Sequence, residues 1–198
     1  SQGAGSVRRF VYVSTTGVYG NRHGDYVDES SPPLATSQRA KRRMDAESVL
    51  RHWAIHQGVN LSILRVPGIY GPNRLPIERL NAKTPALTSE EDAYSNHIHA
   101  DDLARLVLGA LFIGKPQRIV NACDGSEQKM GDYFDEVATA LNLPKPKRLS
   151  REEVRSAVSP MLWSFMSESR RVRNARLTEL KRKLLYPKVA DYLKTLKR

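Results

Sequence analysis

Residues 10–20 read Phe10-Val11-Tyr12-Val13-Ser14-Thr15-Thr16-Gly17-Val18-Tyr19-Gly20. The apolar run at the start of this stretch has no polar alternation, which is typical of a strand buried on both faces of a parallel sheet. The three hydroxyl residues 14–16 then lie at the carboxyl end of the strand, the edge where open α/β sheets bind ligands. A strand followed by a plain Ser/Thr turn is the alternative interpretation.

Strand and helix patterns alternate along the rest of the chain. Strands are expected at about 8–15, 60–66 and 118–123, and loops at 17–37 and 82–94. Helices are expected at about 38–57, 77–81, 103–112, 129–141, 151–158 and 173–185. Asp101 or Asp102 is the expected N-cap of the helix at 103–112. This alternation predicts a parallel, right-handed α/β sheet.

The longest predicted helix, at 38–57, carries apolar residues at helical spacing. The residues expected to form one buried stripe are Ala46, Val49, Leu50, Trp53 and Ala54. Gly58 follows the helix in the manner of a C-cap.

Composition narrows the class of protein. The 198 residues are 40% hydrophobic and 27% charged, which is an ordinary globular composition. No segment has the length of apolar sequence that a membrane span needs, and the first residues are small and polar rather than signal-like. The single cysteine, Cys123, excludes an internal disulfide and a zinc site built on several thiolates. A cytoplasmic protein without a metal site is expected.

The formal net charge of +11 favours phosphate-bearing or polyanionic ligands. The basic residues gather at 39–43, 170–173, 181–183 and 194–198. No aromatic residue is interleaved in these runs, as single-strand binders require, and no nucleic-acid-binding motif is present. Solvated helix faces are therefore favoured over a nucleic-acid partner.

Five motifs in order give the chain a family resemblance. They are residues 10–20, Val27-Asp28-Glu29, Ala46-Glu47, the turn at 65–72 (Arg-Val-Pro-Gly-Ile-Tyr-Gly-Pro) and the stretch at 98–104 (Ile-His-Ala-Asp-Asp-Leu-Ala). The chain resembles an extended short-chain dehydrogenase/reductase of the NAD-dependent epimerase/dehydratase type, and residues 167–177 look like its atypical bacterial branch. The resemblance implies NAD or NADP as cofactor and a nucleotide-sugar-like or other small polar substrate.

The same resemblance implies the domain organisation. The fold class is α/β, with the C-terminal part of a Rossmann-type parallel sheet and a small, mostly helical substrate domain. Residues 1–72 and 95–123 are expected in the second half of the Rossmann domain, and residues 73–94 and 124–198 in the substrate-binding region.

The glycine-rich phosphate turn of the family is not found in this sequence. No Gly-x-Gly-x-x-Gly or P-loop pattern occurs, and the chain starts near the family's fifth strand. It is therefore expected to be the C-terminal two-thirds of a longer protein, with weak or no cofactor binding on its own. The first strand is expected to expose an edge and an apolar patch that a second copy or the absent segment covers.

Active members of the family use a Ser or Thr after this strand, a Tyr, and a Lys four residues beyond the Tyr. Thr15 matches the first position. One alignment register places Arg39 and Arg43 at the Tyr and Lys positions, and another places Ser37 and Lys41 there. Neither register holds a tyrosine. Arginine stays protonated and cannot serve as a base, but it can bind an anion or a ribose hydroxyl.

The resemblance assigns the other site residues. The expected catalytic residues are Thr15, Arg39 and Arg43. The expected cofactor contacts are Ser14, Thr15, Arg43, Pro67, Gly68 and Ile69, and the expected substrate contacts are Thr16, Tyr70, Asn96, His99 and Arg173.

Plain structural roles compete with several of these assignments. Tyr70 and Tyr19 are also explained by packing at the mouth of the cleft. His97 and His99 are candidates for proton transfer, but a hydrogen-bonding role at a helix start is favoured for both.

Three functions remain open. The first is an NAD(P)-binding epimerase/dehydratase or reductase with a degenerate Tyr-Lys site. The second is a non-catalytic NAD(P)-binding redox sensor or scaffold, which the missing tyrosine favours. The third is a basic module for RNA or another polyanion, which only the net charge favours.

Overall fold

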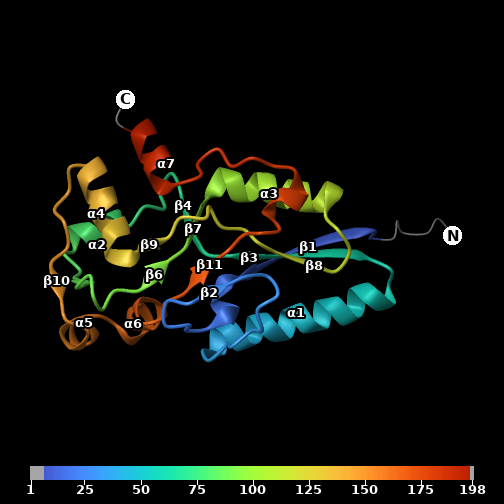
Figure 1. Cartoon of the computed structure of the whole chain (residues 1–198), viewed down its shortest axis with the longest axis horizontal. Coiled ribbons are helices and arrows are strands. Elements are labelled where there is room, and N and C mark those ends of the chain that lie inside the picture. Colours follow the sequence, from blue (N-terminus) through green and yellow to red (C-terminus); the bar gives the residue numbers. More distant parts are fainter. Residues whose placement is uncertain (1–6, 197–198) are drawn as a thin grey trace.

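A computed structural model describes residues 7–196 and contains a three-stranded parallel sheet between two helices (Figure 1). The strands are β1 (Arg9–Thr15), β3 (Asn60–Val66) and β8 (Arg118–Asn121), in the order β1-β3-β8. Helix α1 (Gln38–His56) covers one face of the sheet and α3 (Ala100–Ile113) the other. The predicted parallel α/β fold is confirmed. What was expected of residues 1–6 lies outside the described part of the chain.

The central strand β3 is buried on both faces, as its apolar sequence indicates. Leu64 and Val66 pack in the core beneath α3, whereas Leu61 and Ile63 pack with Ala54 of α1. Successive strand side chains point to opposite faces, so one uninterrupted apolar run supplies both cores.

Short elements surround the sheet. Three two-stranded pairs are β2 (Tyr26–Val27) with β11 (Arg171–Val172), β4 (Gly68–Tyr70) with β7 (His97–His99), and β6 (Tyr94–Ser95) with β9 (Gln128–Lys129). The 3₁₀ turns are η1 (Thr16–Tyr19) and η2 (Leu177–Leu180).

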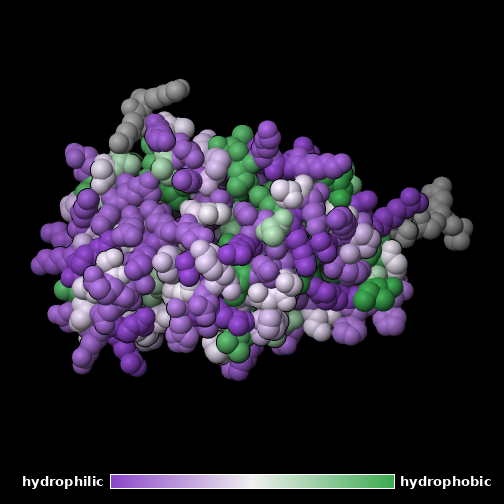
Figure 2. Space-filling model, viewed as in Figure 1, coloured by the Kyte–Doolittle hydropathy of each residue, from purple (hydrophilic) through white to green (hydrophobic). Residues whose placement is uncertain are grey.

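A mostly helical group of elements lies beyond the carboxyl ends of the sheet strands (Figure 1). It comprises α2 (Ile77–Asn81), α4 (Met130–Ala140), α5 (Arg151–Ala157), α6 (Pro160–Met166), α7 (Val189–Thr195) and the strand pair of β5 (Ala86–Leu87) with β10 (Arg148–Leu149). No helix within residues 7–196 combines the length and apolar character that crossing a bilayer requires. The surface in Figure 2 is mostly hydrophilic, with apolar side chains in separate small groups.

The buried stripe predicted for α1 is partly wrong. Val49 is 67% exposed and Trp53 is 37% exposed, whereas Ala40, Glu47 and Ala54 are buried. The pattern was misread because a charged residue, Glu47, occupies the buried face opposite Arg65 of β3. When every charged residue of a helix is assumed to face solvent, the predicted buried face is displaced around the helix axis from the observed one.

Among residues 7–196 the outer edge of β1 is unpaired, and two apolar side chains of this strand are exposed, one on each face of the sheet. Phe10 and Val13 are 36% and 40% exposed, and the Phe10 ring meets Trp53 of α1 edge-on at 5.8 Å. Within the part of the chain that the structure describes, no strand pairs with this edge. What covers it stays a prediction.

Several element boundaries differ from those expected. The helix predicted at 173–185 is absent, and residues 171–172 and 177–180 form β11 and η2 instead. Helices α6 and α7 were not predicted, and the expected loop at 82–94 contains β5. Strand β8 ends at Asn121 rather than at residue 123. Cys123 lies beyond the strand, and its thiol donates to the Val172 carbonyl. The helix was expected to begin at Arg173, directly after residues 171–172, which form the extended segment that pairs with β2.

The start of α3 also differs. Its N-cap is His99, whose Nδ1 accepts from the Asp101 backbone N–H at 3.2 Å, rather than Asp101 or Asp102. The Asp102 carboxylate is buried and accepts from the backbone N–H groups of Leu185 and Tyr186 at 2.7 and 2.9 Å. Because the Asp102 carboxylate binds the backbone of residues 185–186, it does not cap α3, and the His99 imidazole satisfies a backbone N–H at the start of the helix instead.

A buried ion pair joins α1 to the sheet. The Arg65 guanidinium donates to both oxygens of Glu47 at 2.7 and 3.1 Å, and the Ser14 hydroxyl donates to Glu47 at 2.6 Å. The Arg65 guanidinium also lies over the Tyr19 ring, 4.8 Å from its centroid. Every charge in this group has a bonded partner, which is the condition for a buried pair to be tolerated.

Replacing Glu47 with alanine leaves the Arg65 charge and the Ser14 hydroxyl buried without their acceptor. We expect the free energy of unfolding to fall by about 3–5 kcal/mol, measured by urea unfolding followed by circular dichroism. Asp191→Ala is the control, because it removes the exposed pair with Lys194 and should cost less than about 1 kcal/mol. Equal losses in the two variants would contradict this role for Glu47.

Candidate functional site

The carboxyl ends of β1 and β3 open into a cavity of about 260 Å³. We call it the edge cavity. It is lined by Thr15, Thr16, Gly17, Ser37, Arg39, Ala40, Pro67, Gly68, Tyr94, Ser95, Asn96, His97, Met130, Phe165, Glu168 and Arg170. Because β1 and β3 are in register from Arg9↔Asn60 to Thr15↔Val66, the residues that follow the two strands meet at this edge. The cavity lies where a parallel sheet is expected to bind its ligand.

Thr15 ends β1 and keeps one hydrogen-bonding function free. Its Oγ1 accepts from the Gly17 backbone N–H at 3.1 Å and so caps η1. A hydroxyl has one proton to donate as well as lone pairs to accept. The Thr15 proton is therefore available to an oxygen atom of a ligand in the edge cavity.

Arg39 reaches the edge cavity from the first turn of α1. Ser37 sets where this helix begins, because its hydroxyl accepts from the Ala40 backbone N–H at 3.3 Å. The Arg39 guanidinium then stacks on Phe165 of α6, 4.1 Å from the ring centroid. A stacked guanidinium keeps its charge and its in-plane donors, so Arg39 is suited to hold an anion or a hydroxyl.

Three of the expected cofactor contacts do not line the edge cavity: Ser14, Arg43 and Ile69, of which Ile69 lines the second cavity described below. The Ser14 hydroxyl is buried and is bound to Glu47. The Arg43 Nη1 donates to the Tyr12 hydroxyl at 3.1 Å and to the Val13 carbonyl at 3.4 Å, beside the exposed edge of β1. Alternation along β1 accounts for Ser14, because Thr15 and Ser14 point to opposite faces of the sheet.

The expected substrate contacts lie in three places: the wall of the edge cavity, the molecular surface and the apolar core. Thr16 and Asn96 line the edge cavity, although the Asn96 amide also donates to the Arg170 carbonyl at 3.0 Å and accepts from the Val172 N–H at 2.9 Å. Arg173 instead lies over the Tyr26 ring at 4.2 Å, on the molecular surface.

Tyr70 and His99 are core residues. Tyr70 is 0% exposed, and burial raises the pKa of its phenol well above the ordinary value. The His99 ring packs between Tyr186 and Tyr192, with centroids at 4.3 and 4.5 Å, and burial lowers its pKa. Neither residue is part of the cavity walls.

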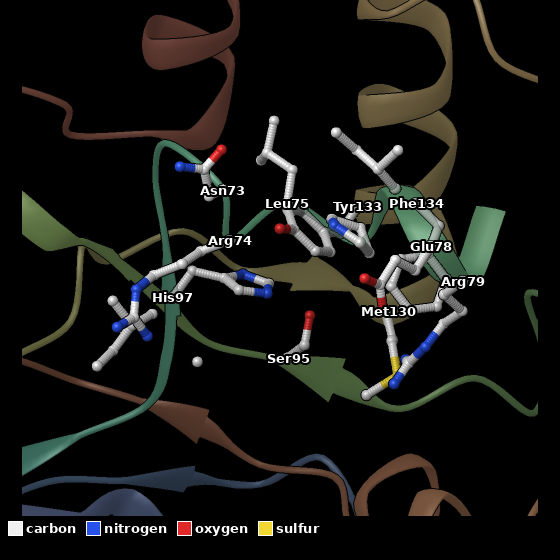
Figure 3. A pocket seen from close by; sticks show the side chains of 14 residues that line it. Asn73, Arg74, Leu75, Glu78, Arg79, Ser95, His97, Met130, Tyr133 and Phe134 are labelled. Atoms are coloured by element: carbon white, nitrogen blue, oxygen red, sulfur yellow. The ribbon is translucent and has the colours of Figure 1, made fainter. Parts of the chain in front are cut away.

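A second cavity of about 730 Å³ lies beside the first (Figure 3). We call it the arginine cavity. It is lined by Gly68, Ile69, Asn73, Arg74, Leu75, Pro76, Ile77, Glu78, Arg79, Ser95, His97, Met130, Tyr133 and Phe134. Arg79 is half-buried over the Phe134 ring at 5.1 Å, and burial lowers its pKa. Neither Arg74 nor Arg79 forms an ion pair with a carboxylate in residues 7–196.

The two cavities share one wall, made by Gly68, Ser95, His97 and Met130. His97 is 7% exposed, and burial lowers the pKa of its imidazole to about 4. Gly68 adds no side chain to the shared wall, and His97 packs closely against it. A Cβ at that position would stand 3.3 Å from the His97 ring.

Sequence reasoning missed much of the cavity lining. Arg74 and Arg79 were not singled out, although they follow directly on the family turn at 65–72. Glu168 and Arg170, which form an ion pair at 2.8 Å in the edge cavity, lie inside the quoted stretch 167–177. Their position in a motif was the available signal. Among residues 7–196 no group of three or more potential metal ligands comes together.

Comparisons with known proteins give related sequences. Human dTDP-D-glucose 4,6-dehydratase is 30% identical over 124 residues, covering 58% of this chain and 35% of that protein. Protein YeeZ of Escherichia coli K12 is 26% identical over 145 residues, covering 71% of this chain and 49% of that protein. The chain thus spans between a third and half of the length of these relatives.

Solved structures agree in fold. A conserved protein of unknown function from Silicibacter pomeroyi matches with a TM-score of 0.82 and 31% identity, covering 96% of this chain and 65% of that one. MoeE5 in complex with UDP-glucose and NAD matches with a TM-score of 0.75 at 19% identity, covering 96% and 64%. The likeness to MoeE5 shows the fold alone.

The family model described as the NAD dependent epimerase/dehydratase family matches residues 3–123, which is more than half of the chain. The observed sheet, with its ligand-sized cavity at the carboxyl ends of the strands, agrees with this match. The chain belongs to the NAD-dependent epimerase/dehydratase family.

Proposed function

We propose that this chain is part of an NAD(P)-binding epimerase/dehydratase-like or reductase-like enzyme that acts on a nucleotide-sugar-like or other small polar substrate. The observation that carries the proposal is the pair of adjoining cavities. One holds Thr15 and Arg39 at the sheet edge, and the other holds Arg74 and Arg79. A reacting group and an anionic group of one ligand would fit side by side. We further propose a cytoplasmic location, on the basis of the single buried cysteine.

The edge cavity fits the nicotinamide end of NAD or NADP. Pro67 and Gly68 line this cavity, and Gly68 adds no side chain to its wall. Bound there, the nicotinamide would supply a hydride acceptor or donor. Thr15 would donate its hydroxyl proton to the reacting oxygen of the substrate, and Arg39 would hold a ribose hydroxyl or an anionic group.

The arginine cavity fits the anionic part of a nucleotide sugar. Its volume of about 730 Å³ is in the range of small-molecule sites. Arg79 has a partly desolvated charge without a carboxylate partner among the described residues, so a phosphate would meet little competition. The human relative that is 30% identical to this chain is named a dTDP-D-glucose 4,6-dehydratase, which supports this class of ligand.

A non-catalytic NAD(P)-binding sensor or scaffold is the second candidate. The observation that favours it is Arg39, which occupies the family's Tyr position in one register and is stacked on Phe165. A guanidinium stays protonated and cannot accept a proton from a substrate. Within the described lining of the edge cavity, Tyr94 is the one tyrosine, and it comes from β6 rather than from α1.

Replacing Arg79 with methionine tests the substrate site. We expect the affinity for UDP-glucose, measured by isothermal titration calorimetry, to fall about 10- to 100-fold, because one charge-assisted hydrogen bond contributes about 1.5–3 kcal/mol. Arg42→Met is the matched control, since Arg42 is an exposed arginine of α1 outside both cavities. Absence of UDP-glucose binding, or an unchanged affinity in Arg79→Met, contradicts the nucleotide-sugar assignment.

Replacing Thr15 tests the reaction. In the whole protein of which this chain is part, we expect Thr15→Ala to lower the NAD⁺-dependent turnover of UDP-glucose by about 100-fold, because the donor to the reacting oxygen is lost. Thr15→Ser keeps both the donor and the cap of η1, and should retain most of the activity. Product formation is followed by mass spectrometry. NAD(P)H binding without turnover in the unmodified whole protein would favour the sensor instead.

A further inference from the structure

His97 has an unusual environment for a core histidine. Its ring packs on Tyr133, with centroids 4.2 Å apart, and its Nδ1 is enclosed without a hydrogen-bond partner within residues 7–196. His99, two residues along β7, has its Nδ1 bonded to the Asp101 N–H at 3.2 Å, and its Nε2 is also buried without a partner, but His99 lines neither cavity. The His97 Nε2 also has no hydrogen-bond partner among residues 7–196, and buried polar atoms are nearly always paired, so both nitrogens of this cavity-lining ring call for an explanation.

The Cδ2–Nε2 edge of the ring lies against Gly68, and His97 is a lining residue of both cavities. The Cδ2 and Nε2 atoms lie 3.3 and 3.8 Å from the place where a Gly68 Cβ would stand, and Gly68 belongs to the shared wall. Figure 3 shows the His97 ring pointing into the arginine cavity, beside Ser95. The pairing of Gly68 with His97 between β4 and β7 fixes the ring at this place.

We propose that His97 is a ligand-binding residue whose Nε2 forms a hydrogen bond with a hydroxyl or carbonyl oxygen of a ligand that occupies both cavities. The inference rests on the proposed function, because it assumes one polyhydroxylated ligand with its anionic part near Arg79 and its reacting part near Thr15. His97 then marks the point where the two parts join.

The protonation state of the ring agrees with this role. Burial lowers the pKa of His97 to about 4, so the imidazole is neutral at pH 7. A neutral ring has one nitrogen that donates and one that accepts, and it repels neither the Arg74 nor the Arg79 side chain of the same cavity.

Imidazole nitrogen NMR on the full 198-residue chain tests the proposal. The probes are UDP-glucose, UDP, glucose and NADP⁺, each titrated separately. We expect UDP-glucose to shift the Nε2 resonance of His97, which is assigned by its loss in His97→Phe. The resonances of His99 serve as the internal control and should stay in place, because that ring is capped and 1% exposed.

Two variants separate binding from packing. His97→Phe keeps an aromatic ring on Tyr133 but removes the hydrogen bond, and should weaken UDP-glucose binding about tenfold. His97→Gln restores a donor and an acceptor and should recover part of the affinity. Near-ultraviolet circular dichroism checks that both variants keep the native packing.

The outcomes distinguish this inference from the proposed function. If no probe moves the His97 resonance, or if His97→Phe binds as tightly as the unmodified chain, the role of His97 is overturned. If glucose or NADP⁺ shifts His97 and UDP-glucose does not, the role of His97 stands and the nucleotide-sugar assignment fails.

Discussion

The salt bridge between Glu47 and Arg65 is the contact on which the arrangement of the site depends. It binds the middle of α1 to the central strand, and Ser14 of β1 donates to the same carboxylate. Arg39, eight residues before Glu47, is carried by the same helix. A shift of α1 along the sheet would break three buried hydrogen bonds at once, so the distance between Arg39 and the end of β1 is closely fixed.

The network extends from the ion pair toward the loops that close the site. The Tyr19 ring lies against Arg65, and its hydroxyl donates to Asn121 at 2.8 Å. The Asn121 side chain in turn donates to the Arg173 carbonyl at 2.8 Å. The segment that carries Glu168 and Arg170 is therefore held by polar side chains as well as by Val172, which packs with Val18 and Cys123 in a small apolar cluster.

The central fold was readable from the sequence because its signals are local. The apolar runs of β1 and β3 and the capped helix α1 each have a pattern that needs no distant partner to be recognised. The buried face of α1 was predicted incorrectly because Glu47 is buried only through its ion pair with Arg65, a residue of another element.

The site residues show the same limit of sequence-based prediction. Thr15 follows directly on its strand and was placed correctly at the edge, whereas the orientations of Ser14, Arg43 and Tyr70 depend on contacts that spacing alone does not show.

The carboxylate of Asp102 has a consequence for the cooperativity of folding. By accepting from the backbone of Leu185 and Tyr186, it closes a loop of 83 residues and anchors the approach to α7 in the first turn of α3. Helix α7 contributes Tyr192 and Leu193 to the core around α4. Asp102 thus links the helical elements beside the sheet to α3, the helix that covers one face of the sheet. Local opening of the C-terminal segment would be coupled to the start of α3, which favours a single unfolding transition over two independent ones.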